Sequence, residues 1–214
     1  MNGLFITLEG PDGSGKSTQI GRIADYLNEQ NVSFIQTREP GGTAISDKVR
    51  ELILDPAHAE MADMTEILLY AASRAQHVHE KIIPALTEGK VVLCDRFVDA
   101  SIAYQGYGLQ VGAETVEAIN RYATGGVKPD RSYLIDVSPE TGRSRMRARY
   151  SGTQLDRIEQ KEFSYHNRVR EGFHRLAEEQ NDRIRLIDGE RGTDDVFEEI
   201  KKDLEILLNT HFMK

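Results

Sequence analysis

Short apolar stretches alternate along the chain with longer stretches in which apolar residues recur every three or four positions. The short stretches predict buried strands at residues 4–8, 32–36, 90–94, 131–137 and 183–187. The longer stretches predict helices at residues 16–30, 43–54, 61–88, 99–106, 113–123, 139–149, 158–179 and 193–209. Strands that alternate with helices favour a three-layer α/β fold, in which a five-stranded parallel sheet is flanked by helices.

The longest helical pattern, residues 61–88, predicts a helix with two distinct sides. Its apolar residues recur at helical spacing and form one stripe, which we expect to face the core. The stripe consists of Met64, Leu68, Ala71, Ala75, Val78, Ile82 and Leu86. A polar and aromatic band lies beside it, made of Tyr70, Arg74, His77 and Lys81. This band predicts the border of a ligand cleft.

A phosphate-binding pattern follows the first predicted strand. Residues 10–17 match G-x-x-x-x-G-K-[ST], in which glycines let the backbone N–H groups curl around an anion. Lys16 is expected to contact the terminal phosphates and Ser17 to bind Mg2+. The predicted ATP-binding residues are Gly10, Pro11, Asp12, Gly13, Ser14, Gly15, Lys16, Ser17 and Thr18. The alternative is a glycine-rich turn that binds nothing, but the flanking strand and helix favour the phosphate loop.

Length and charge narrow the class of protein. A chain of 214 residues without repeats predicts one domain, residues 1–214, in which the polar break at 150–154 is a flap and not a linker. The net charge of −8 argues against a nucleic-acid partner. No apolar run approaches the length of a membrane span, and the short polar start before the first strand leads us to expect no signal peptide. The single cysteine, Cys94, fits a buried strand position and a reducing cytoplasm.

Charged residues gather where strands are predicted to end. In parallel α/β sheets, ligands bind at the carboxyl ends of the strands, so these residues are expected to converge. They are Glu9, Arg38, Glu39, Asp95 and Arg96. A carboxylate such as Asp95 at a strand end resembles the one that holds Mg2+ in phosphate-loop enzymes. Its alternative role is to pair with a neighbouring arginine.

Arginines predict a second anion site. Arg38, Arg74 and Arg96 each carry a guanidinium group suited to bidentate phosphate binding, although surface positions or structural ion pairs are alternatives. Five further arginines flank the polar break and can neutralise charge that develops on a transferred phosphoryl group. They are Arg143, Arg145, Arg147, Arg149 and Arg157, and they define a lid at about residues 143–157. The first four do not share one helix face, so a solvated helix is the alternative.

Six sequence blocks together resemble the thymidylate kinases of bacteria. They are the phosphate loop and residues 37–42 (TREPGG), 70–74 (YAASR), 95–97 (DRF), 103–106 (AYQG) and 155–159 (LDRIE). The blocks at 37–42 and 95–97 are highly specific in this order and spacing. The resemblance covers essentially the whole chain. It implies a P-loop fold and a cytoplasmic homodimer that converts ATP and dTMP to ADP and dTDP with Mg2+, for dTTP synthesis.

The resemblance also implies roles for individual residues. Arg38, Arg74 and Arg96 would hold the dTMP phosphate, and Asp12 and Glu39 would act near the sugar and the magnesium ion. Tyr104 would crowd the ribose 2′ position. Ser101 and Gln105 would read the thymine edge. Tyr70 stands where the family usually has a phenylalanine that stacks on the base.

Three assignments complete the implied site. Arg50 is placed among the substrate-binding residues, and the metal ligands would be Ser17, Asp95 and Glu39. The catalytic residues would be Lys16, Asp12 and Arg96 together with Arg149 and Arg147 of the lid. Some members carry an arginine at the position of Gly13, so this chain is expected to supply that charge from the lid.

Two other functions compete with this reading. The first is a P-loop kinase that phosphorylates a different small acceptor, against which the blocks at 70–74 and 101–106 argue. The second is a nucleotide-regulated binding switch for GTP, which would need a guanine-reading N-K-x-D block that the sequence lacks.

Overall fold

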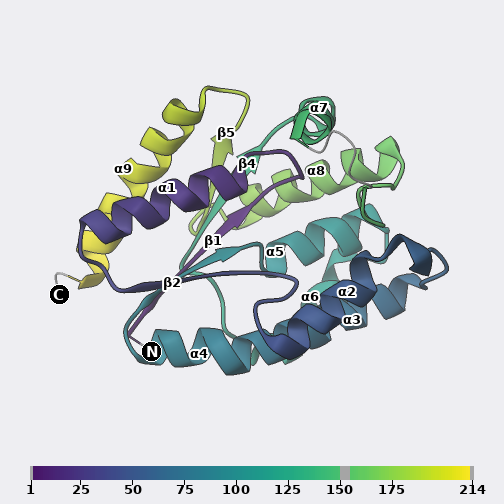
Figure 1. The fold of residues 1–214 in the computed structure, drawn as a ribbon, viewed down its shortest axis with the longest axis horizontal. Helices are drawn as coiled ribbons and strands as arrows, with labels where there is room; N and C mark the ends of the chain where they lie inside the picture. The colour runs from purple at the N-terminus through teal and green to yellow at the C-terminus, as the bar shows by residue number, and fades with distance from the viewer. Residues whose placement is uncertain (1, 150–154, 213–214) are drawn as a thin grey trace.

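The computed structural model describes residues 2–149 and 155–212, and within them five parallel strands form one sheet in the order β2-β3-β1-β4-β5 (Figure 1). The strands are β1 (Leu4–Glu9), β2 (Phe34–Arg38), β3 (Val91–Asp95), β4 (Arg131–Asp136) and β5 (Ile184–Asp188). The predicted strands are confirmed within a few residues. β2 starts later than predicted because the Val32 N–H donates to the Leu27 carbonyl and extends the end of the preceding helix.

Helices cover both faces of the sheet, which confirms the predicted three-layer α/β fold. α1 (Lys16–Glu29) and α9 (Thr193–Phe212) pack on one face, while α3 (Asp63–His77), α4 (Ile83–Thr87) and α8 (Phe163–Glu179) lie on the other (Figure 1). The side chains of β1 alternate between the two layers. Leu4, Ile6 and Leu8 pack towards α1 and α9, and Phe5 packs on the opposite face. Cys94 is buried in β3, as predicted.

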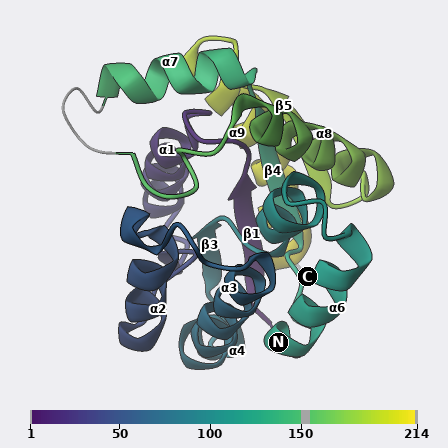
Figure 2. The same ribbon diagram turned by 90° about the vertical axis from the view of Figure 1, so that its right-hand side faces the viewer.

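Four further helices complete the described fold. They are α2 (Ala44–Leu54), α5 (Val98–Ser101), α6 (Ala113–Thr124) and α7 (Pro139–Arg149). α2 packs along α3, and Thr43 caps its start by accepting a hydrogen bond from the Ser46 N–H. Figure 2 shows α7 on one side of the start of α1 and α2 on the other. None of the helices within residues 2–149 and 155–212 is long and apolar enough to cross a membrane.

The helix predicted over residues 61–88 is divided into three segments. α3 ends at His77, a π-helical turn spans Val78–Ile82, and α4 follows with Pro84 in its first turn. Proline has no N–H to donate to the preceding turn, which fits a change of helix geometry at this point. A second π-helical segment, Ile102–Gly108, extends α5 and covers most of the helix predicted over 99–106.

The predicted apolar stripe of the 61–88 segment is wrong at three of its seven positions, whereas Ala71, Val78, Ile82 and Leu86 are buried as predicted. Met64 and Leu68 are 43% and 52% exposed, and Ala75 is also exposed. The buried face of α3 instead includes charged residues such as Glu66 and Arg74. Each of these charges has a partner on another segment, so burial here follows ion pairing that the apolar periodicity does not reveal.

The helix predicted from residue 158 begins only at Phe163. The Asp156 carboxylate accepts hydrogen bonds from the N–H groups of Ile158 and Glu159, and Glu159 accepts one from the Asp156 N–H. These local bonds close a turn that competes with the helix. The remaining helices are confirmed within about four residues of their predicted ends. The polar break at 150–154 lies outside the described residues.

Candidate active site

The phosphate loop joins the end of β1 to the start of α1, as the sequence pattern predicts. Its Gly13 has φ +78°, and a Cβ there would lie 2.3 Å from the carbonyl oxygen of Gly142 in α7. A larger residue at position 13 therefore has no room against α7. The loop backs directly onto the helix that carries the predicted lid arginines.

Lys16 lies folded against the loop from which it starts. Its Nζ donates hydrogen bonds to the carbonyls of Gly10 and Pro11, at 3.1 and 2.8 Å, and the side chain is buried. Burial and the nearby Arg96 charge lower the pKa of Lys16 to about 8. Terminal phosphates in the loop would give this ammonium anionic acceptors in place of neutral carbonyls.

A cavity of about 500 Å3 opens in front of the loop. Its wall includes Ser17 and Asp95, two of the predicted metal ligands, and the guanidinium-bearing residues Arg38 and Arg96. One carboxylate oxygen of Asp95 is buried and has no hydrogen-bond partner among the described residues. An unpaired carboxylate oxygen beside a serine hydroxyl fits the oxygen ligands that Mg2+ prefers.

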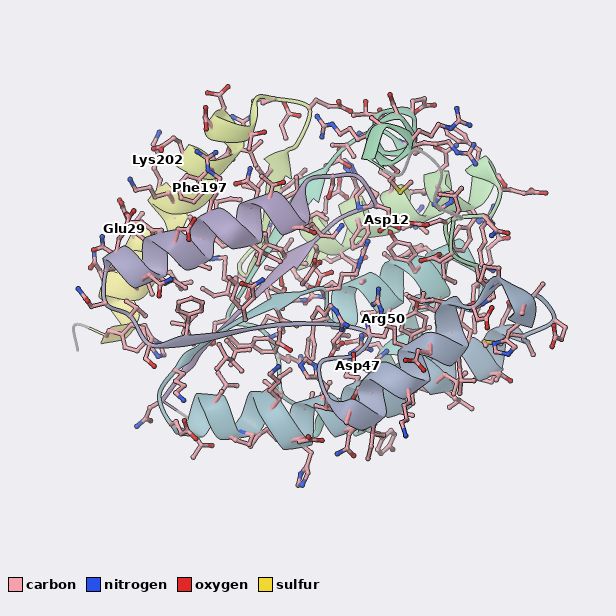
Figure 3. The ribbon with its side chains drawn as sticks, viewed as in Figure 1. Asp12, Glu29, Asp47, Arg50, Phe197 and Lys202 are labelled. Carbon is pink, nitrogen blue, oxygen red and sulfur yellow. The ribbon has the colours of Figure 1, made fainter. Side chains whose placement is uncertain are left out.

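A second cavity lies behind the first and carries most of the predicted acceptor residues. Both cavities are lined by Asp12, Glu39, Arg50, Arg96 and Asp156, so they adjoin along a shared wall, and we call the two together the crevice. The second cavity alone is lined by Tyr70, Arg74, Ser101, Tyr104 and Gln105. In Figure 3, Arg50 projects from α2 into the space below the loop that holds Asp12. The structure thus brings the predicted donor and acceptor residues together.

Arg96 stands at the junction of the two cavities. Its guanidinium donates to the Gly10 carbonyl at 2.8 Å and to the Asp12 carboxylate at 2.5 Å. The Tyr104 hydroxyl donates to the other Asp12 oxygen at 3.1 Å. Burial alone would raise the pKa of Asp12, but Arg96 and Lys16 lower it to about 2. Arg96 has φ +69°, a costly conformation for a non-glycine residue that the surrounding contacts must hold.

Arg74 lies at the deep end of the acceptor cavity and is almost fully bonded to protein. Its Nε donates to Glu39 at 2.7 Å, and its terminal nitrogens donate to Ser101, Asn120 and the Phe97 carbonyl. Four of its five N–H groups can therefore be accounted for. Its predicted part in phosphate binding rests on the one N–H that remains.

Both carboxylate oxygens of Glu39, which pairs with Arg74, also have partners in the protein. Its second oxygen bonds to Nδ1 of His77 at 2.9 Å, and the carboxylate is buried. Both oxygens of this predicted metal ligand thus already have a partner, whereas Asp95 has a free one. Arg38, by contrast, is half exposed and pairs with Asp47 at the mouth of the crevice.

The base-reading residues predicted from the sequence lie side by side in the acceptor cavity. The Ser101 hydroxyl oxygen accepts from Arg74, and Gln105 is buried with its amide nitrogen bonded to Glu66. Tyr70 lines the same cavity, and burial, followed by the Glu66 charge, raises the pKa of its hydroxyl. Glu66 is a buried residue of α3, and nothing in the sequence pattern indicates that it takes part in this site.

The lid arginines have different environments. Arg145 lines the phosphate cavity and donates to the Gly189 carbonyl, while Arg147 is exposed. The side chain of Arg149 lies outside what the structure describes, together with residues 150–154. Arg157 is buried in an ion pair with Glu66 and bonded to the Ile53 carbonyl, away from the phosphate loop. It is therefore a structural residue, against its predicted place in the lid.

Comparisons with known proteins agree with this geometry. The family model described as thymidylate kinase matches residues 8–200. The chain is 52% identical over 204 residues to the thymidylate kinase of Exiguobacterium sibiricum, covering 95% of each chain. It is 46% identical over 199 residues to that of Clostridium novyi, covering 93% of this chain and 97% of the relative. A crystal structure of thymidylate kinase from Ehrlichia chaffeensis superposes with a TM-score of 0.76 at 33% identity, covering 95% of this chain and 98% of the other.

Proposed function

Because this chain belongs to the thymidylate kinase family, we propose that its crevice passes the terminal phosphoryl group of ATP directly to the phosphate of dTMP. The observation that carries the proposal is that the two cavities adjoin and share Asp12 and Arg96 in their walls. Phosphoryl transfer requires positioning and charge neutralisation more than covalent chemistry. A loop for one phosphate chain that faces an arginine-lined pocket for another meets that requirement.

On the donor side, the backbone N–H groups of residues 10–18 would hold the ATP phosphates, with the N-terminus of α1 behind them. Lys16 would then leave the carbonyls of its own loop and bond to the terminal phosphates. The ammonium would neutralise the charge that develops between donor and acceptor.

On the acceptor side, Arg96 is the residue best placed to hold the dTMP phosphate, because it lies at the junction with the donor cavity. Arg50 lines the same junction and Arg38 lines the phosphate cavity, so both would add charge, and Arg74 would contribute its remaining N–H. Tyr104 is fixed by its bond to Asp12, so its ring would stay where it limits space at the ribose 2′ position. Tyr70, Ser101 and Gln105 would contact the base.

The residues fit an Mg2+ ion, which would neutralise part of the phosphate charge when bound. Ser17 and the free oxygen of Asp95 would hold it. Glu39 stays a predicted ligand, although Arg74 and His77 already use both of its oxygens.

We also propose that the protein is a single-domain, cytoplasmic enzyme that forms a homodimer. α2 and α3 expose four large apolar side chains between 43% and 56%, which a second copy would cover. They are Ile45, Leu52, Met64 and Leu68. Sedimentation should show a dimer for the wild type and a monomer for Leu68→Glu, with Ile206→Glu on α9 as the control that stays dimeric.

The experiment that tests the function is release of ADP from ATP with each nucleoside monophosphate in turn. We expect strong release with dTMP, weak release with dCMP or dGMP, and dependence on added Mg2+. Equal release with every acceptor would point to a different small-acceptor kinase. Slow hydrolysis that ignores the acceptor would point to a binding switch.

A further inference from the structure

The side-chain amide of Gln105 is buried, and only one of its two polar atoms has a hydrogen-bond partner among the described residues. The residue is 1% exposed and lines the acceptor cavity. Its Nε2 donates to Oε1 of Glu66 at 3.0 Å, while its Oε1 has no hydrogen-bond partner among the described residues. A buried polar oxygen without a partner costs free energy unless a ligand satisfies it. The amide therefore needs a donor from the molecule that enters this cavity.

The direction of that amide is imposed by its neighbours. Glu66 is fully buried, and its second oxygen accepts from the Arg157 guanidinium at 2.7 Å. Both carboxylate oxygens of Glu66 therefore act as acceptors, one from the Arg157 guanidinium, which can only donate, and one from Gln105. Only the NH2 end of Gln105 can face such a group. The carbonyl end must therefore face the other way.

We propose that Glu66, held by Arg157, is a positioning residue that makes the enzyme select a base with a hydrogen at N3. The inference rests on the proposed contact between Gln105 and the base of dTMP. The carbonyl of Gln105 accepts from the thymine N3–H. Cytosine has a bare nitrogen acceptor at N3, so it would place two acceptors face to face.

The Ser101 hydroxyl, which lines the same cavity, adds a hydrogen-bond donor to the acceptor of Gln105. Ser101 accepts from Arg74, which leaves the hydroxyl hydrogen of Ser101 free to donate. A donor beside an acceptor matches the O4 and N3–H of thymine in order, and mismatches the amino group and N3 of cytosine. A site of buried polar groups rejects a mismatched partner more strongly than an apolar pocket does.

The test compares dTMP with 5-methyl-dCMP, which keeps the methyl group and changes only the polar edge. In Glu66→Gln, the new amide can donate or accept a hydrogen bond, so the side-chain amide of Gln105 is free to flip. We expect the ratio of kcat/KM for dTMP to that for 5-methyl-dCMP to fall about tenfold or more. The control is Asp99→Asn, which removes an equally buried carboxylate from an ion pair with Arg183. Its ratio should stay within about twofold.

A double-variant cycle separates positioning from a general structural defect. In a Gln105→Leu background, adding Glu66→Gln should not lower the ratio further, because the amide that Glu66 directs is gone. If Glu66→Gln does not fold, Arg157→Lys and Arg157→Gln provide the same test. The lysine keeps a cation beside Glu66 and should keep the ratio, whereas the glutamine should lose it.

Two results overturn the inference. One is a folded Glu66→Gln enzyme with the full preference for dTMP, and the other is an equal loss in both backgrounds of the cycle. Failure of the proposed function looks different, because the wild-type enzyme itself would then fail to prefer dTMP over 5-methyl-dCMP.

Discussion

The two halves of the crevice are built from different kinds of contact. The donor half is centred on one continuous segment, residues 10–18, whose sequence is the phosphate-loop pattern and whose residues line one side of the phosphate cavity. The acceptor half is made mainly of residues from the turns after β2 and β3, from α2, α3 and α5, from the π-helical segment Ile102–Gly108 and from the turn at 155–158. A local backbone shape suffices for the first, while the second exists only when distant segments pack together.

The two halves of the crevice also differ in how their charged residues are paired. The acceptor half contains buried ion pairs such as Arg74 with Glu39 and Arg157 with Glu66, each less than 10% exposed. Removing one member leaves a buried charge without a partner, which is strongly destabilising. Lys16 in the donor half bonds mainly to neutral carbonyls. Substitutions in the donor half should therefore change rate, and those in the acceptor half should change substrate preference and stability together.

The largest effect should come from the donor half. Lys16→Ala removes the charge that faces the terminal phosphates and should lower kcat by about 10²–10³-fold. Stability should change little, because the ammonium is held in a buried site that lowers its pKa. Steady-state kinetics and thermal unfolding check the two parts, with exposed Lys48→Ala as the control. A variant with near-normal turnover would end the role assigned to Lys16.

The acceptor half should respond differently to the loss of one charge. Arg96→Ala removes the bonds to Gly10 and Asp12 and should lower kcat/KM for dTMP by about 10²-fold, while KM for ATP changes little. It should also lower the melting temperature, since Asp12 loses its partner. Arg22→Ala, which breaks an exposed pair with Asp194, is the matched control. If KM for ATP rose as much as KM for dTMP, the division of the crevice would be wrong.

The contrast between a local backbone loop and side chains from distant segments explains which parts of the site could be predicted from the sequence. Residues 10–17 fix their own backbone shape, so their role follows from the residue types and spacing. The convergence of Arg38, Arg74 and Arg96 on one crevice could be predicted from the carboxyl ends of the strands, from the polar band of the 61–88 segment and from the family resemblance. The pairing of Arg74 with Glu39 and of Arg157 with Glu66 could not be predicted, because it depends on how α3 packs against other segments. The same pairing buries Glu66 in place of Leu68 and so overturned the predicted stripe.

Substitutions of the lid arginines test which of them acts together with the donor half of the crevice. Arg149→Ala should lower kcat by about tenfold with little change in either KM, because the charge acts on the transferred group. Arg147→Ala is the alternative that the sequence left open, and Arg145→Ala is the one whose side chain lines the phosphate cavity. Measuring all three variants in parallel assigns the role. A loss confined to Arg145→Ala would move it one helical turn back from Arg149.

The smallest effect concerns Glu9, the last residue of β1, which directly precedes the phosphate loop. Its Oε1 accepts the Phe97 N–H at 2.8 Å and so holds the turn in which Arg96 adopts its positive φ. Burial, followed by the Asp99 charge, raises the pKa of Glu9 from 4.5 to about 8. Between these pH values the folded state binds a proton that the unfolded state has lost. Stability contributed by this proton is therefore present below pH 4.5 and is lost as the pH rises to about 8.

Glu9→Gln removes that titration and keeps the acceptor for Phe97. The melting temperature of the variant, relative to the wild type, should therefore rise by a few degrees as the pH increases through this window. Exposed Glu29→Gln should run parallel to the wild type. Parallel curves for Glu9→Gln as well would mean that Glu9 is ionised in the folded protein. The turn at Arg96 would then be held by a charge rather than by a neutral acid.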